Sequence, residues 1–500
     1  MQKKWRVLPK AADSLIKSYS DKHWLELQLL HNRGIVEDQE VESFFSTDYH
    51  GQLFDPYLFS QMEKAVALII RHIKEKNKIY IFGDYDADGV TSSALLSEVL
   101  EMLKGDLSVY IPDRVSEGYG MNSRAVEEIA RKGAKLIITV DNGIRNKSEI
   151  ELAKSLGVDV VVTDHHPAPL DRNDWPDCPI INPVIPDEKY PFKKLAGVGV
   201  AFKLASAIIA KAKLEDDIKR ILSERLLDLV AIGTVADCVF LVGENRVLVK
   251  RGLEVLSTHR RPGCREICSV AGLTENGRSL DSWNIGFQIA PRLNAAGRMD
   301  HANTAYELLR TRNTEEAKAL ALRLNDRNYD RQVITDEIVT YIREELKGMR
   351  ADEKIIIASS PSIAGKEDLW NEGVVGLVAG RICEEFYLPT LVVTGNNGDV
   401  KGSGRSIEEF NIVKALEECS DLLDKYGGHP AACGFSLKES NFAEFRKRME
   451  KIAKRELSGK DLAPSILLEA ELDLSSVDEE TYEIVQKFSP FGQGNEQPKF

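Results

Sequence analysis

The sequence predicts an α/β protein built on a parallel sheet that is flanked by helices. Between about residues 78 and 165, short β-branched and apolar runs alternate with helical patterns, the rhythm of a parallel sheet with crossover helices. A smaller α/β pattern starts at KIIIASS (354–360) and ends near residue 457. The charged amphipathic pattern between them, from about 303 to 347, is long and polar, which is typical of a helix that bridges two domains.

The apolar periodicity divides the first α/β region into strands and helices. We expect strands at KIYIF (78–82), DLSVYIP (106–112), KLIITV (135–140) and VDVVVT (158–163), and helices near 90–103, 122–133 and 147–157. Asn122 is placed to cap the second of these helices, and Gly133 and Gly157 stand just past two helix ends. A mostly helical stretch follows this region and ends near residue 257.

The second α/β region is smaller and rich in glycine. Its expected elements are KIIIASS, EGVVGLVAGRICEEF (372–386) and TLVVTG (390–395). Glycines cluster in its segments KGSGRS and YGGHPAACGFS. The segment that follows, residues 461–500, is expected to open a third unit that breaks off at Phe500.

Length, charge and cysteine content limit the classes of protein. A chain of 500 residues with 43% hydrophobic content has room for on the order of two to four domains. The net charge of −13 argues against nucleic-acid binding over the whole surface but is compatible with a local basic groove. The N-terminus lacks the apolar segment of a secretory signal, and no uncharged apolar run approaches the ~18 residues that span a bilayer. We therefore expect a soluble, cytoplasmic protein.

The seven cysteines are scattered and odd in number, which predicts a reducing compartment rather than a disulfide framework. Cys264 and Cys268, together with His259, offer three zinc ligands. No fourth ligand stands at the spacing of a zinc finger, so packing in a core is the favoured interpretation of these cysteines.

The segment GDYDADGVTSSALL (83–96) places Asp84, Asp86 and Asp88 at alternate positions before a glycine. A calcium-binding EF-hand loop starts in the same way, but it ends in a bidentate Glu at its twelfth position, which here is Leu95. The segment also follows an expected strand, whereas an EF-hand loop follows a helix. The carboxylates therefore stand between a strand and a helix, which is where ligands bind in open α/β sheets.

Acidic and imidazole groups follow two further strands of the same expected sheet. The third strand runs into DNG (141–143) and the fourth into DHH (164–166), while Asp237 ends the apolar helix ERLLDLVAIGTVADC (224–238). The candidate metal ligands from these segments are Asp86, Asp88, Asp141, His165 and Asp237. Oxygen ligands with one imidazole suit Mn²⁺ or Mg²⁺. One carboxylate bridging two ions about 3.5 to 4 Å apart would make a two-metal hydrolase.

Each of these groups has a structural explanation on its own. A lone Asp at a strand end is usually a turn former or a helix cap, and of two adjacent histidines one is often packed and the other exposed. The convergence of the groups on three consecutive strand ends favours a metal site instead. Two ions could position a hydroxide, lower its pKa and take up charge on a phosphodiester, whose own charge repels hydroxide.

The motifs DYDADG, DNG, DHH and GTVADC, followed by YGGHPAACGF, resemble those of the DHH phosphoesterase superfamily and, within it, the RecJ single-strand exonucleases. The resemblance covers about residues 20–500 and rests on a specific combination of motifs. It implies an N-terminal helical extension (1–50), a DHH catalytic domain (51–300), a connecting helix (301–349), a DHH-associated substrate-binding domain (350–460) and the truncated start of an OB-like domain (461–500).

The resemblance also implies roles for individual residues. The implied ligands of two divalent ions, Mn²⁺ or Mg²⁺, are Asp84, Asp86, Asp88, Asp141, His165 and Asp237. In catalysis Asp141 would bridge the ions, His166 would contact the scissile phosphate and Asp164 would steady the neighbouring histidine. The residues implied to hold a 5′ phosphate and the strand backbone are Arg114, Arg292, Arg298, Ser403, Arg405, Gly427, Gly428 and His429.

The activity implied by the resemblance is 5′ to 3′ hydrolysis of single-stranded DNA to mononucleotides, in DNA repair and recombination. A monomer is expected, with a single-strand binding protein and a helicase as protein partners and no membrane. Two alternatives stay open: a phosphoesterase for oligoribonucleotides, nucleoside bisphosphates or cyclic dinucleotides, and a non-catalytic DNA-binding scaffold. No G-x-x-x-x-G-K-[ST] loop is present and GVGVAF (197–202) is not a full dinucleotide fingerprint, so ATP-driven unwinding is not indicated.

Overall fold

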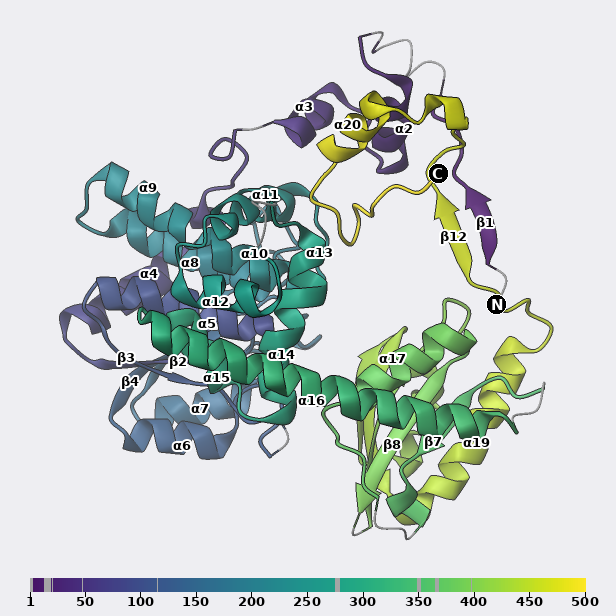
Figure 1. Ribbon diagram of the computed structural model, residues 1–500. Helices are drawn as coiled ribbons and strands as arrows, with labels where there is room; N and C mark the ends of the chain where they lie inside the picture. The colour runs from purple at the N-terminus through teal and green to yellow at the C-terminus, as the bar shows by residue number, and fades with distance from the viewer. Residues whose placement is uncertain are drawn as a thin grey trace. The chain divides into compact units, whose positions relative to one another are not determined.

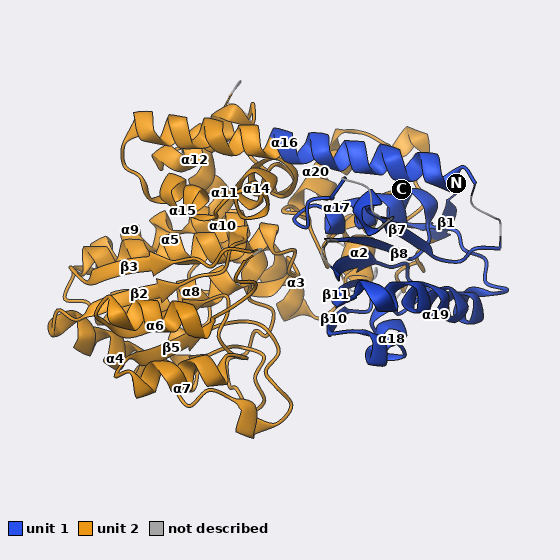
Figure 2. Cartoon of the chain, turned by 90° about the horizontal axis from the view of Figure 1, so that it is seen from below, with its two compact units in different colours: residues 1–6, 329–467 blue, residues 7–328, 468–500 orange. Residues whose placement is uncertain are grey.

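The chain falls into two compact units in this computed structural model (Figures 1 and 2). The larger unit comprises Val7–Asn328 and Leu468–Phe500, and the smaller comprises Met1–Arg6 and Tyr329–Leu467. The residues that the structure describes are 3–12, 19, 21–46, 48–114, 116–274, 279–348, 352–364, 368–396 and 398–500. Within them no helix combines the length and apolar character that crossing a membrane requires.

A five-stranded parallel sheet forms the centre of the larger unit, as the sequence predicts. Its strands lie in the order β3-β2-β4-β5-β6, and each neighbouring pair runs parallel. Their bounds are β2 Lys78–Phe82, β3 Asp106–Tyr110, β4 Ala134–Val140, β5 Asp159–Thr163 and β6 Ile180–Ile181. Apolar residues on both faces of β2, β4 and β5 are buried, as expected where helices cover both sides of a parallel sheet, whereas the edge strand β3 has no buried residue.

Helices pack on both faces of this sheet (Figure 1). Ile79 and Ile81 of β2 belong to one core with α4 (Met62–Lys74), α5 (Ala87–Met102) and α8 (Gly197–Lys211). Tyr80 and Phe82 belong to another, with α6 (Ser123–Arg131) and α7 (Lys147–Ser155). Asn122 caps α6 as predicted, because its side chain accepts a hydrogen bond from the main-chain N–H of Ala125 at 2.9 Å.

Further helices extend the first of these cores. They are α9 (Asp216–Arg225), α10 (Leu227–Ala236), α11 (Gly243–Ser257), α12 (Pro262–Val270), α13 (Ser282–Asn284), the π-helix η3 (Ile285–Ile289), α14 (Ala290–Met299) and α15 (Asn303–Arg310). Helix α10 is buried from Leu227 to Thr234 and packs against α5, α8 and α11. Cys264 and Cys268 of α12 are buried in the same core, so they pack as predicted.

The charged pattern predicted as a single connecting helix forms two helices. Helix α15 ends at Arg310, and α16 runs from Thr314 to Leu346, from the larger unit into the smaller one. The break follows from the Asn313 side chain, which accepts hydrogen bonds from the main-chain N–H groups of Glu315 and Glu316 and so starts a new helix.

The smaller unit contains a second five-stranded sheet, in the order β10-β11-β9-β8-β7. Its strands are β7 Ile356–Ser359, β8 Thr390–Asn396, β9 Asp399–Arg405, β10 Lys425–His429 and β11 Ala432–Lys438. Strands β7 and β8 run parallel, and the other neighbouring pairs run antiparallel. Helices α17 (Val375–Phe386), α18 (Ile412–Glu417) and α19 (Glu439–Leu457) pack against this sheet.

Segments from near the two ends of the chain pair with each other. Strand β1 (Lys4–Val7) pairs with β12 (Ser465–Leu468), and the helices near the N-terminus are α2 (Trp24–Asn32) and α3 (Asp38–Phe45). Helix α20 (Glu479–Lys487) shares a small core with α2. Residues 468–500 thus belong to the larger unit, and the OB-like unit predicted at this end is not confirmed.

Candidate metal centre

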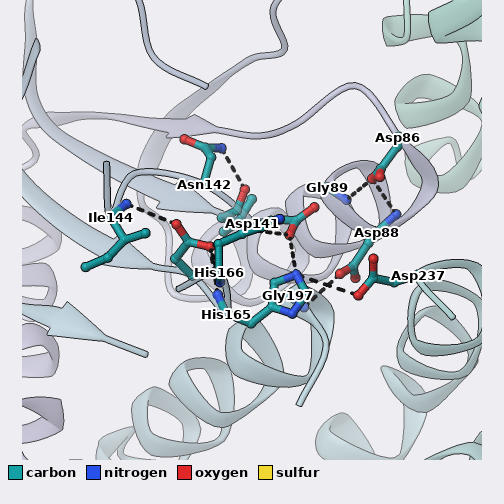
Figure 3. Close-up of polar contacts among 12 residues, drawn as sticks. Asp86, Asp88, Gly89, Asp141, Asn142, Ile144, His165, His166, Gly197 and Asp237 are labelled. Atoms are coloured by element: carbon teal, nitrogen blue, oxygen red, sulfur yellow. Dashed lines mark hydrogen bonds and ion pairs between the residues drawn. The ribbon is translucent and has the colours of Figure 1, made fainter. Parts of the chain in front are cut away.

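Three adjacent strands of the parallel sheet end at one edge, and acidic or imidazole side chains follow each of them (Figure 3). Phe82 at the end of β2 pairs with Thr139 of β4, and Val140 pairs with Thr163 at the end of β5. This register brings together the three loops that carry the predicted ligands: 83–88, 141–143 and 164–166. Asp237 joins them from the C-terminal end of α10.

Asp86 is both a helix cap and a candidate ligand. Its Oδ1 accepts hydrogen bonds from the main-chain N–H groups of Asp88 and Gly89, each at 3.0 Å. This cap starts α5 at Ala87, three residues before the start that periodicity predicts. The structural explanation of a lone Asp is therefore correct here, and the same side chain also offers an oxygen to the cluster described below.

The N-terminus of α8 holds Asp88. Its Oδ2 accepts a hydrogen bond from Gly197 at 2.7 Å, and its Oδ1 accepts one from Val198 at 2.8 Å. A Cβ atom at Gly233 would lie 2.9 Å from that Oδ1, so α10 also approaches closely. Sequence reasoning missed Gly197 and Val198. The sequence feature that could have identified them is GVGVAF. Its glycines let the main chain come close to a carboxylate rather than to a dinucleotide.

The six predicted ligands, together with His166, which is predicted to contact the phosphate, form three groups whose ligand atoms lie within 4.8 Å of one another: Asp84, Asp86 and Asp141; Asp88, His165 and Asp237; and Asp141, His165 and His166. Nε2 of His165 lies 3.1 Å from Oδ1 of Asp141 and 3.6 Å from Oδ2 of Asp237. Asp141 and His165 each belong to two groups, and of these two side chains only the carboxylate, with its two oxygens, could contact two ions.

Four buried atoms of this set have no hydrogen-bond partner among the described residues: Oδ1 of Asp84, Oδ1 of Asp141, Nε2 of His165 and Oδ2 of Asp237. Folded proteins rarely leave buried polar atoms unpaired. Here the unpaired atoms are three carboxylate oxygens and one imidazole nitrogen, which face one another. Such a donor set fits divalent ions that prefer oxygen and tolerate imidazole, as Mn²⁺ and Mg²⁺ do.

The pKa values of the carboxylates also indicate a site for divalent cations. Burial, followed by the charge of Asp86, raises the pKa of Asp88 to about 7. Burial and the charge of Asp88 raise the pKa of Asp237 to about 9 and that of Asp141 well above its ordinary range. Burial, followed by the charge of Asp86, raises the pKa of Asp84 well above its ordinary range. Without a cation these groups repel one another, and a bound cation would reverse these shifts.

His165 is held in the form that binds metal. Burial, followed by the charge of His166, lowers the pKa of His165 to about 4. The ring is therefore neutral at physiological pH, and its unpaired Nε2 offers a lone pair toward Asp141 and Asp237.

Asp164 contacts the ring of His166. Its Oδ1 lies 2.8 Å from Nδ1 of His166, and its Oδ2 accepts a hydrogen bond from the N–H of Ile144. Burial alone would lower the pKa of His166, but the hydrogen bond and charge of Asp164 outweigh burial and raise it. The same pairing lowers the pKa of Asp164 despite its burial. The neighbouring histidine that Asp164 steadies is thus His166, and the pair favours a protonated imidazole.

Tyr119, which sequence reasoning missed, fixes the proton on His166. Its hydroxyl lies 3.0 Å from the main-chain oxygen of Asp141 and 3.0 Å from Nδ1 of His166. A carbonyl oxygen can only accept, so the hydroxyl donates to Asp141 and its oxygen accepts from Nδ1–H. Nε2 is then the nitrogen that His166 presents to other groups. Asp141 itself has φ 63°, a left-handed conformation that is uncommon outside glycine.

The predicted substrate residues of the larger unit lie in the segment after β3 and on α14. The guanidinium of Arg114 lies 4.8 Å from the ring centre of Tyr85, which follows Asp84 in the chain. Arg292 of α14 donates to Oδ1 of Asn325 at 3.1 Å, and Arg298 lies in the last turn of α14. A Cβ atom at Gly297 would lie 2.6 Å from the main-chain oxygen of Tyr85, so α14 packs directly on the first ligand loop.

The predicted substrate residues of the smaller unit lie together on β9 and β10. Arg405 and His429 both pair with Ala432 of the strand between them, and Ser403 and Gly427 both pair with Gly434. Gly428 stands between these rows with φ 140°. The side chain of His429 is exposed, whereas burial lowers the pKa of Arg405.

Two family models match the chain. The model of the DHH family, N-terminal domain, matches residues 78–234, which hold β2 to β6 and all but one of the predicted ligands. The model of the DHHA1 domain matches residues 352–455 of the smaller unit.

Curated proteins named single-stranded-DNA-specific exonuclease RecJ are similar over most of the chain. The Bacillus subtilis protein is 38% identical over 95% of this chain and 58% of its own length. The Salmonella typhimurium protein is 34% identical over 100% and 87%, and the Escherichia coli protein is 35% identical over 95% and 82%. The chain thus spans little more than half of the first relative and most of the other two.

Two solved structures that are similar to this chain also carry the name RecJ. RecJ from Thermus thermophilus in complex with Mn²⁺ has 30% identity and a TM-score of 0.81, over 99% of this chain and 69% of that one. A structure of the exonuclease RecJ bound to manganese has 34% identity and a TM-score of 0.67, over 81% of this chain and 97% of that one.

Proposed function

Because this chain belongs to the RecJ family of single-stranded-DNA-specific exonucleases, we propose that it hydrolyses single-stranded DNA from the 5′ end in a metal-dependent reaction that releases mononucleotides. The observation that carries the proposal is the set of unpaired buried oxygen and nitrogen atoms at the edge of the parallel sheet. Both solved relatives described above hold manganese.

Two divalent ions, Mn²⁺ or Mg²⁺, are proposed to bind to the grouped side chains. Asp84 and Asp86 would hold one ion, Asp88, His165 and Asp237 the other, and Asp141 would contact both. The bound ions would stabilise charge on the phosphate oxygens and lower the pKa of an attacking water.

His166 acts on the scissile phosphate in this proposal. Its Nδ1 is engaged by Asp164 and Tyr119, which leaves Nε2–H of the protonated ring to donate a hydrogen bond to a phosphate oxygen. Asp164 raises the pKa of that ring, which favours its protonated form, and fixes its orientation, so its role is positioning. The donor is in place before substrate arrives, which favours the charge that develops in the transition state.

The remaining predicted residues are proposed to bind the strand. In the larger unit these are Arg114, Arg292 and Arg298, and in the smaller unit Ser403, Arg405, Gly427, Gly428 and His429. Arginine suits phosphate because its planar guanidinium can donate two parallel hydrogen bonds. We also infer a role in DNA repair and recombination in the cytoplasm, as a monomer working with a single-strand binding protein and a helicase.

The test is the degradation of 5′-labelled and 3′-labelled single-stranded oligonucleotides with added Mn²⁺. Wild type should release labelled mononucleotide from the 5′ label, and Asp141→Ala should abolish this release because it removes the carboxylate shared by two groups. The control is Asp216→Ala, which removes a fully exposed carboxylate of α9 and should behave as wild type. Release from the 3′ label would contradict the polarity, and cleavage of dinucleotides alone would indicate a small-substrate phosphoesterase.

A further inference from the structure

Two large aromatic side chains are exposed side by side on the helical run formed by α13 and η3. Trp283 is 56% exposed and Phe287 is 69% exposed. Their rings are stacked, with centres 5.5 Å apart and planes inclined by 23°. Single exposed apolar residues are common on protein surfaces, but a stacked pair on one helical face presents a flat apolar surface to solvent.

The local structure keeps the side chains of Trp283 and Phe287 exposed to solvent. Asp281 and Asn284 form a capping box that fixes the start of α13, and the chain continues directly into the π-helix η3 and then α14. Ile285 and Ile289 are fully buried and take the core-facing side of this run. Single-turn π-helices inside longer helices are rare and are frequent at functional sites.

The helical run from α13 to α14 touches two of the elements that carry the candidate ligands. A Cβ atom at Gly286 would lie 3.7 Å from Cγ1 of Val235, which closely precedes Asp237 in the chain. At its other end, Oδ1 of Asn294 accepts a hydrogen bond at 2.8 Å from the N–H of Ala87, beside Asp86. The helical run that carries the aromatic pair is therefore packed against α10 and the start of α5, two of the elements that carry candidate ligands.

We infer that Trp283 and Phe287 form a stacking platform for unpaired bases of the single strand. The inference rests on the proposed function and deepens it by naming how bases, rather than phosphates, are bound. Every base has an aromatic face, so a platform of this kind accepts any sequence, and it excludes paired bases whose faces are already covered. The pair is contiguous with α14, whose Arg292 is proposed to contact the strand backbone.

Four variants test the platform, with Tyr482→Ala as a matched control because Tyr482 of α20 is 63% exposed. Trp283→Ala and Phe287→Ala should each raise KM for a long single strand by roughly 5- to 100-fold and change kcat little, in line with the effect of removing one stacked base. Trp283→Phe and Phe287→Tyr, which keep a ring, should restore most of the affinity. The dependence of KM on salt should stay that of wild type, since no charge is removed.

Oligonucleotides with one abasic site at successive positions give a readout that misfolding cannot imitate. For wild type, one position should raise KM several-fold, because the base that stacks there is missing. The same abasic site should have no further effect in Trp283→Ala or Phe287→Ala. The platform would be overturned if an abasic site raised KM equally in wild type and variants, or if both alanine variants kept the wild-type KM. Either result would leave the exonuclease activity in place.

Binding of the same oligonucleotides without added metal separates this inference from the proposed function. If wild type fails to cleave but loses oligonucleotide affinity on Trp283→Ala, measured by fluorescence anisotropy, the platform stands and the exonuclease proposal fails. If wild type neither cleaves nor shows a variant-dependent affinity, both are overturned, and the pair is left as a contact surface for protein.

Discussion

A Cβ atom on Gly197 would lie 2.6 Å from Oδ1 of Asp141, so helix α8 can begin beside the proposed metal ligands only because residue 197 has no side chain. The same residue donates its N–H to Asp88. Gly197 thus supports two candidate ligands: its N–H donates to Asp88, and the absence of a side chain leaves room for Asp141.

Gly197→Ala should therefore weaken metal binding and activity together. We expect at least a tenfold loss of Mn²⁺ affinity, because a Cβ at that distance must displace either the carboxylate or the helix. Isothermal titration with Mn²⁺ measures the loss. Gly348→Ala is the control, since a Cβ there would come no closer than 3.8 Å to another atom. Wild-type affinity in Gly197→Ala would show that α8 does not restrain the site.

The stability of the metal-free protein should fall as the pH rises. The pKa values of Asp88 and Asp237, about 7 and about 9, lie above the ordinary 3.8, so the folded state binds protons more tightly than the unfolded state. The stabilisation is complete below about pH 4 and is lost as the pH rises through these values. Calorimetry in EDTA should show the decline, and Asp237→Asn should flatten it.

Mn²⁺ should stabilise the protein more at pH 9 than at pH 5, because the ions compete with protons for the same oxygens. The melting temperature measured at a fixed Mn²⁺ concentration checks this. A metal effect that is equal at both pH values would mean that the ions bind elsewhere.

Asp164→Asn should lower kcat by about 10- to 100-fold while Mn²⁺ affinity changes less, because the side chain contacts the ring of His166 but reaches His165 only through its main-chain N–H, at 2.7 Å. Without the carboxylate the pKa of His166 falls, so the activity that depends on its protonated form should be lost at lower pH than in wild type. A pH–rate profile measures both effects. Asp216→Asn is the control for removing a carboxylate, and an unshifted profile in Asp164→Asn would contradict the pairing.

Tyr119→Phe should reduce kcat by about tenfold and stability by about 1 kcal/mol, with KM unchanged. The hydroxyl holds both the main-chain oxygen of Asp141 and Nδ1 of His166, so its removal frees the ring without altering a ligand. Tyr110→Phe is a matched control, since that hydroxyl contacts Glu117 instead. Equal effects of the two substitutions would assign Tyr119 a structural role only.

Local patterns in the sequence were enough to predict the strands and the loops that follow them. Strand β2 and the cap Asn122 appear where periodicity and capping place them, because both depend on neighbouring residues. The start of α5 differs because Asp86 caps it earlier than apolar periodicity indicates. The break before α16 likewise reflects a side-chain cap, at Asn313, inside a pattern that looks continuous.

Long-range contacts were beyond prediction from the sequence. Gly197 matters because of Asp88 and Asp141, which reach it only after the sheet and α8 have packed. Tyr119 contributes a hydroxyl to residues in the loops that follow β4 and β5, and nothing in its own segment identifies those partners. The exposure of Trp283 is equally a property of packing, since the helical pattern alone would assign a tryptophan to the core.

Two main-chain N–H groups of α8 hold the carboxylate of Asp88. The loop at residues 83–88 would therefore not keep its geometry if it were copied alone into another protein. A designer who copied residues 78 to 166 into another scaffold would carry over three strand ends and their side chains, but the amides come from α8 and Asp237 from α10. The grafted Asp88 would then lack both donors and point its oxygens into an empty space. The candidate metal site therefore depends on the sheet together with the helices that pack on it, and the strand-end motifs alone would not reproduce it.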